Sequence, residues 1–218
     1  MTYHEPLLDK LQRKFGRYAI HNLMLYIVIG MAAVYVLDMV AAPLMGFRLS
    51  SLLAFNRAAI LRGQIWRLVT FIFIPPNSSM LFIIFALYFD YLVGTALQQQ
   101  WGSFRFNLYY LCGMLGTVMA GFLTGYATNT YLNMSLFIAF ALLYPDFELL
   151  LLILPVKVKC LALISAVGVV YSLIVDSWAG KLALLVSLIN VALFFWHDGV
   201  NTVKNAYRRY QWKKNWRR

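Results

Sequence analysis

Three side chains lie where their chemistry would matter, each inside or beside an apolar run. Ser135 lies within the apolar stretch 131–144, Asp90 lies within 80–97, and His197 follows the last apolar stretch. A serine hydroxyl becomes a nucleophile when a base lies within hydrogen-bond reach, and a carboxylate inside a membrane is costly enough to predict a function. The first questions are therefore whether Ser135 has a base and what Asp90 contacts.

The spacing argues against a serine–histidine pair. About ten residues, or roughly 15 Å along a helix, separate Ser187 from His197, so His197 is predicted to lie toward the opposite face of the membrane from Ser135. We expect the Ser135 hydroxyl to bond within its own helix or to pack against a neighbour. The sequence thus predicts no catalytic residue and no cofactor.

Asp90 leaves two interpretations open. It lies about 12 residues, or some 18 Å, into its predicted helix, a depth at which a carboxylate is costly. It is either a functional acid or an acid that points into the bundle or toward the interface and is paired or protonated. Asn133 and Asn190 are the other polar side chains that we predict inside the membrane.

The composition requires a membrane around these residues. Of the 218 residues, 62% are hydrophobic and 12% are charged, and the mean hydropathy is +0.70, whereas soluble domains carry about 25% charged residues. We predict an all-α polytopic membrane protein that forms one domain over 1–218. Its two cysteines, Cys112 and Cys160, show no paired spacing and are predicted to pack in or beside the spans, with no disulfide and no metal site.

Six apolar stretches are predicted to span the membrane, and the fourth is unusually short. That stretch has about 14 residues, below the roughly 20 that a span needs, so we expect longer neighbours to surround it. A further apolar run over 147–154 has charges at both ends and is predicted to stay at the cytoplasmic surface. The predicted spans are 21–37, 80–97, 106–123, 131–144, 160–175 and 182–196.

The basic residues indicate the orientation. This arrangement places 14 Lys and Arg residues inside and five outside, which predicts both termini in the cytoplasm. The basic N-terminus (1–19) and the basic tail (199–218) then face membrane lipids with anionic headgroups. We therefore attribute the net charge of +11 to topology and predict no nucleic-acid partner. We expect no cleaved signal peptide, because no small-residue cleavage site follows a short apolar core.

Between the first two spans lies a loop that is too short to cross the membrane. Leu68 to Ile74 is apolar but for Thr70, and Pro75 and Pro76 end the run because neither has a backbone N–H. Trp66 suits the membrane interface, and the Arg67 guanidinium can donate to several carbonyls. We predict a shallow membrane-embedded loop whose own carbonyls are bonded by Arg67, with Trp66, Arg67, Pro75 and Pro76 as its structural or client-binding residues.

Glycines in the third predicted span suggest close helix packing. Gly121 and Gly125 form a GxxxG pair, and Gly113 and Gly116 add small surface nearby. The alternative is that glycine is simply common in membrane helices.

Two segments carry a resemblance to a known family. GQIWRLVTFIF over 63–73, followed by WGSFRFNLYYL over 101–111, is similar to the derlins and their bacterial relatives in the rhomboid superfamily. Weaker matches extend through YLNMSLFIAF, PDFELLLLILPVKVK and LFFWHD, so that the resemblance covers about 23–198. It implies a six-transmembrane-helix bundle with a shallow membrane-embedded first loop.

The resemblance also implies a function. Active rhomboid proteases use a serine in a Gly-x-Ser-Gly motif of the fourth span and a histidine in the sixth; here Ser135 keeps the serine position, but both glycines and the histidine are missing. We therefore expect a pseudoprotease that binds transmembrane helices of client proteins in quality control or trafficking, and a soluble quality-control partner is a further candidate. The expected location is a bacterial plasma membrane, or the endoplasmic reticulum in a eukaryote. The alternatives are an active intramembrane serine protease using Ser135 and a small transporter or channel using Asp90.

Overall fold

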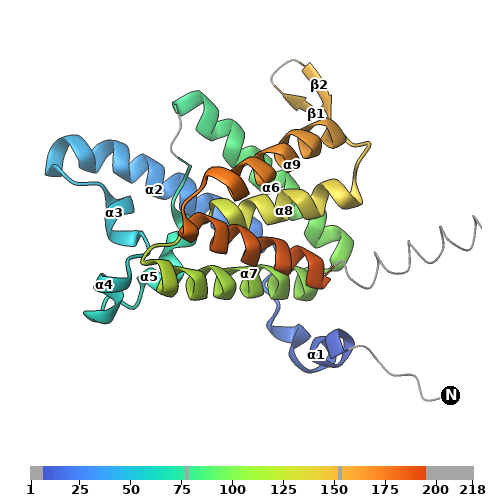
Figure 1. Ribbon diagram of the computed structural model, residues 1–218, viewed down its shortest axis with the longest axis horizontal. Helices are drawn as coiled ribbons and strands as arrows, with labels where there is room; N and C mark the ends of the chain where they lie inside the picture. The colour runs from blue at the N-terminus through green and yellow to red at the C-terminus, as the bar shows by residue number, and fades with distance from the viewer. Residues whose placement is uncertain (1–6, 77–78, 152–153, 195–218) are drawn as a thin grey trace, which may run out of the picture.

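A computed structural model describes residues 7–76, 79–151 and 154–194 as a bundle of helices with one short hairpin (Figure 1). Within these residues, three helices are long and apolar enough to cross a membrane: α2 (Leu23–Met45), α6 (Met80–Trp101) and α7 (Ser103–Thr124). Shorter apolar helices are α8 (Thr130–Leu143), the Cys160–Val175 part of α9 (Val158–Val175), and Trp178–Phe194. The chain is a helical, membrane-embedded protein.

Short elements connect and flank these helices. They are α1 (Leu7–Phe15), η1 (Gly16–Tyr18), α3 (Leu49–Leu53), α4 (Arg57–Leu61), α5 (Arg67–Thr70), η2 (Phe71–Phe73), and the strands β1 (Glu148–Leu151) and β2 (Leu154–Lys157). The predicted basic tail (199–218) and His197 lie outside the described residues.

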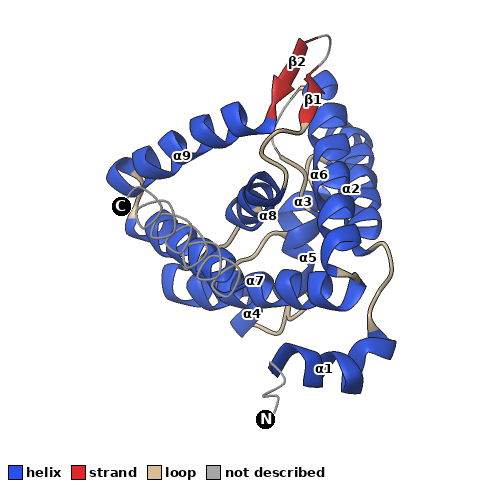
Figure 2. Cartoon of the chain, turned by 90° about the vertical axis from the view of Figure 1, so that its right-hand side faces the viewer, coloured by secondary structure: helices blue, strands red, loops and turns tan. Residues whose placement is uncertain are grey.

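The short helix α8 lies at the centre of the bundle. It packs against α6, α7 and α9, and α2 packs against α6. Figure 2 shows α2 and α6 on one side of α8 and α9 on the other. Leu132, Leu136 and Phe140 follow one another at helical spacing and are fully buried. Longer helices therefore surround the short one, as its length predicted.

Three predicted boundaries are wrong. We predicted that the first span ends before Pro43, but Pro43 lies in the last turn of α2, which ends at Gly46 with φ +71°. The predicted polar turn over 98–105 is reduced to Gly102, because glutamines are good helix formers and Gly102 alone takes a positive φ of 81°. The last loop, predicted over 176–181, is likewise shorter, because a helix resumes at Trp178.

The run that we predicted at the cytoplasmic surface forms the hairpin. Glu148 pairs with Lys157 in the antiparallel register, and their side chains approach to 3.8 Å. An uninterrupted apolar run does not reveal a strand by its periodicity, so no strand was predicted here. The hairpin is the local exception to the predicted all-α class.

The glycines of α7 differ in their roles. A Cβ on Gly113 would meet Leu132 Cδ1 and would lie 2.9 Å from Asn190 Nδ2. Gly116 and Gly121 are equally crowded, the first by Val186 and the second by Phe55 and Ala127. Gly125 is different: it ends α7 with φ +97° and has open space around it, so its predicted packing role is wrong.

The two cysteines do not pack in the core. Cys112 and Cys160 are both exposed on the surface of the protein and form no disulfide. Their predicted packing role is wrong, because a cysteine in an apolar helix can face lipid as readily as another helix. Among the described residues, no group of three or more His, Cys, Asp or Glu side chains lies together as a metal site would require.

Candidate functional site

Trp66, Arg67 and Thr70 form a cap over the end of α3. Arg67 Nη1 donates to two carbonyls at 2.9 and 2.7 Å, Thr70 Oγ1 donates to a third at 2.9 Å, and Trp66 Nε1 lies 3.4 Å from a fourth. The two acceptors of Arg67 are Ser51 O and Ala54 O. Thr70 donates to Leu53 O, and Trp66 lies beside Leu52 O. We call these three donors the α3 cap.

The need for this cap follows from helix geometry. The last four carbonyls of a helix have no partner within the helix, and α3 has only five residues. Arg67 and Thr70 are separated by three positions, which brings both side chains to one face of α5. Arg67 is only 7% exposed and also donates through Nε to Gln64 Oε1 at 2.6 Å. The Trp66–Arg67 pair thus fixes the loop to the segment that precedes it.

Our prediction that Arg67 bonds the carbonyls of its own loop is wrong. Asn129 donates to two of those carbonyls, Ile72 O at 3.1 Å and Ile74 O at 2.8 Å. Side chains on a helix tilt toward its N-terminus, so the first residue of α5 projects away from the residues that follow it. Arg67 therefore reaches back to α3, and a different side chain bonds the loop.

Thr70 and Asn129 were not predicted from the sequence as functional residues. Thr70 left a signal, because it is the one polar residue in the run 68–74 and lies one helical turn after Arg67. Asn129 left none, since its partners lie 55 and 57 residues away along the chain. Only the fold brings the loop between α7 and α8 against the Ile72 and Ile74 carbonyls.

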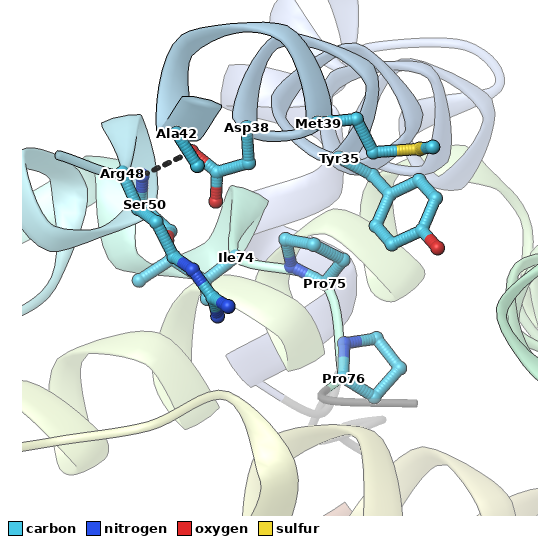
Figure 3. A pocket seen from close by; sticks show the side chains of 9 residues that line it. All are labelled: Tyr35, Asp38, Met39, Ala42, Arg48, Ser50, Ile74, Pro75 and Pro76. Atoms are coloured by element: carbon cyan, nitrogen blue, oxygen red, sulfur yellow. Dashed lines mark hydrogen bonds between the residues drawn. The ribbon is translucent and has the colours of Figure 1, made fainter. Parts of the chain in front are cut away.

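The two prolines end the loop beside a cavity. Ile74, directly before Pro75, is extended with φ −78° and ψ 118°, as a residue before proline should be. Pro75 and Pro76 line a cavity of about 510 Å³ together with residues of α2 and of the segment that begins α3 (Figure 3).

Inside the bundle, the structure brings two of the predicted polar residues together. Asn133 Nδ2 of α8 donates to Asp90 Oδ2 of α6 at 3.1 Å, and both residues are half-buried. Asp90 thus points into the bundle and not toward the interface. This direction is compatible with both interpretations, a functional acid and a paired structural one. The partner of Asp90 is a neutral amide, and no described Lys or Arg pairs with it.

Several buried polar atoms of the bundle have no partner among the described residues. Within the described chain, Asn133 Oδ1, Tyr110 OH and Asn107 Oδ1 make no hydrogen bond. Tyr110 is 3% exposed and interacts electrostatically with Asp90. A buried polar group without a partner costs about 1–3 kcal/mol, so such atoms need an explanation. We call Asp90, Tyr110 and Asn133 the polar cluster.

Ser135 and Asn190 do not join the polar cluster through the hydrogen bonds that they make. Ser135 is fully buried, and its hydroxyl donates to Leu132 O of the same helix at 2.7 Å. Asn190 Nδ2 donates to Tyr109 O at 3.2 Å, which joins the Trp178–Phe194 helix to α7.

No family model matches the chain, and no curated protein matches its sequence. The chemistry available is thus that of the two polar regions themselves. The donors of the α3 cap already bond backbone carbonyls of the same chain. The polar cluster instead keeps buried acceptor and hydroxyl oxygens that have no partner within the described chain.

Proposed function

We propose that this chain is a catalytically inactive, rhomboid-like membrane protein that binds transmembrane helices of client proteins. We propose six spans with both termini in the cytoplasm, in a bacterial plasma membrane, and a role in membrane-protein quality control or trafficking. The observation that carries the proposal is the polar cluster, in which Tyr110 OH and Asn133 Oδ1 have no partner among the described residues.

The position of the cluster suits a client helix. Asp90 lies near the middle of α6, and Asn133 lies on α8, whose 14 residues extend about 21 Å against a bilayer core of about 30 Å. Asp90 and Asn133 are half-buried as residues, so a helix that packs along α6 and α8 can contact their exposed atoms. Polar side chains of that helix then find acceptors in the membrane, where such hydrogen bonds contribute about 1–2 kcal/mol in model peptides.

The surroundings of Ser135 support a function other than proteolysis. The hydroxyl proton of Ser135 is already donated to Leu132 O, and the Trp178–Phe194 helix contains no histidine to act as a base. A client helix at the polar cluster is therefore bound without being cut.

One observation favours a second candidate, a small transporter. Unpartnered oxygens beside a membrane carboxylate are also what a path for protons or small cations requires. Flux into proteoliposomes tests this candidate. A transporter loses its flux in Asp90→Asn, whereas a client-binding protein shows no flux in either form.

Photocrosslinking in cells tests the leading proposal. A photoreactive amino acid at Tyr91, which is 37% exposed beside Asp90 on α6, should capture transmembrane segments of other membrane proteins. Met119, an exposed residue of α7, is the matched control position and should capture few. If both positions capture the same proteins to the same extent, binding is not directed by the polar cluster and the proposal is wrong.

A further inference from the structure

The cavity beside the prolines has a mixed lining. Tyr35, Asp38, Met39 and Ala42 follow the helical spacing of 3, 4 and 7 residues, which places them along one face of α2. Figure 3 shows this face on one side, Arg48 and Ser50 at one end, and the two prolines opposite. Its volume of about 510 Å³ falls in the range of about 300–1,000 Å³ that is typical of small-ligand sites.

Two opposite charges line the cavity without meeting each other. Asp38 Oδ1 accepts a hydrogen bond from the Ser50 backbone N–H at 3.1 Å, and Asp38 Oδ2 has no partner within the described chain. The exposed Arg48 side chain makes no hydrogen bond or ion pair there either. The cavity therefore offers one acceptor oxygen and one fork of N–H donors to a ligand.

The depth of the cavity indicates which molecules reach it. Asp38 lies seven residues before Met45, or about 10 Å from the end of a helix that spans the membrane. Arg48 follows that end, whereas Met39 and the prolines add apolar surface. The charges thus lie where lipid headgroups meet acyl chains, and the surrounding phospholipid is the ligand present at highest concentration.

We propose that this cavity binds a phospholipid whose headgroup carries both a phosphate and a primary ammonium group, as in phosphatidylethanolamine. The Arg48 guanidinium donates to the phosphate, for which its planar fork is well shaped. Asp38 accepts an N–H of the ammonium group, while its other oxygen keeps the bond to Ser50. The prolines and Met39 contact the start of the acyl chains.

Native mass spectrometry of the full-length protein in detergent tests this proposal. The probe is an equimolar mixture of phosphatidylethanolamine, phosphatidylcholine and phosphatidylglycerol with identical acyl chains. We expect about tenfold preferential retention of phosphatidylethanolamine, because choline has no N–H donor and glycerol has no positive charge; one charge-assisted hydrogen bond is worth a factor of that order.

Three variants separate the two charges. Asp38→Asn keeps an acceptor for the Ser50 N–H but loses the carboxylate, and should retain the three lipids about equally. Arg48→Gln should lower retention of all three, whereas Arg57→Gln, an exposed arginine of α4 outside the cavity, should not. Equal retention by the unaltered protein, a preference that survives Asp38→Asn, or equal behaviour of Arg48→Gln and Arg57→Gln would each overturn the proposal.

Discussion

The α3 cap and the polar cluster are both polar regions of an apolar chain, but they differ in how their groups are partnered. In the cap, the last four carbonyls of the α3 segment each meet a side-chain donor from α5 or from Trp66. In the cluster, the Asp90–Asn133 hydrogen bond is accompanied by buried oxygens that have no partner within the described chain.

This difference separates stability from binding. A region whose hydrogen bonds are all made gains nothing from a ligand, and losing one partner leaves a buried group unsatisfied. A region with unsatisfied buried oxygens is destabilised by their lost hydration until another molecule supplies donors. Variants of the α3 cap should therefore lower stability, while variants of the polar cluster should alter binding.

The largest effect on stability is expected from Arg67→Ala. The change leaves the Ser51 and Ala54 carbonyls and the Gln64 amide oxygen without their charged donor, which should cost about 3 kcal/mol of unfolding free energy. Arg67→Lys keeps the charge but loses the fork, so it should lose about half as much. Thermal unfolding in detergent measures both, with the exposed Arg62→Ala as control. A loss no greater than that of Arg62→Ala would contradict the cap.

Gly113→Ala should come next. The new methyl group meets Leu132 and lies 2.9 Å from Asn190 Nδ2, and such overpacking costs about 2 kcal/mol. Gly168→Ala in α9 is the matched control, because its methyl group enters open space; it should leave stability unchanged or raise it by about 0.5 kcal/mol. Equal unfolding midpoints for the two variants would show that α7 does not pack this closely.

Asn129→Ala should have a smaller effect. It removes the donors for Ile72 O and Ile74 O and should cost about 1.5 kcal/mol. Hydrogen exchange of the loop over 71–76 should rise as well, since the loop loses its link to the segment before α8. The exposed neighbour Thr128→Ala serves as control. If hydrogen exchange of the loop rises equally in Thr128→Ala, Asn129 does not bond the loop.

The smallest effect is expected at the hairpin. Glu148 and Lys157 lie 3.8 Å apart with side chains 57% and 47% exposed, and an ion pair in such surroundings contributes at most about 0.5 kcal/mol. The thermal unfolding midpoint of Glu148→Gln should therefore lie within about 1 °C of that of the unaltered protein. A large loss would mean that the hairpin has a role beyond its own two strands.

The sequence predicted what depends on short-range pattern. The apolar stretches predicted the long helices, and the length of 131–144 predicted the central position of α8. The two prolines predicted the end of the loop. Helix boundaries depend less on this pattern, because Pro43 is tolerated in the last turn of α2 and a single glycine, Gly102, suffices to end α6 and begin α7.

The candidate site depended on contacts that no local pattern reveals. Arg67 was recognised as a donor, but its acceptors lie 13 and 16 residues earlier, and the direction of its side chain decided between them and its own loop. Asp90 and Asn133 were both singled out, yet their pairing across 43 residues follows only from the packing of α6 on α8. Asn129 had no sequence signal at all.

One double variant tests the separation of stability from binding most directly. Asp90→Leu combined with Asn133→Leu replaces both partners of the hydrogen bond by apolar side chains of similar size, which is close to neutral for stability. We predict an unfolding midpoint at or above that of the unaltered protein, together with a severalfold loss of client crosslinking from Tyr91. Undiminished crosslinking in the folded double variant would show that the polar cluster does not bind client helices.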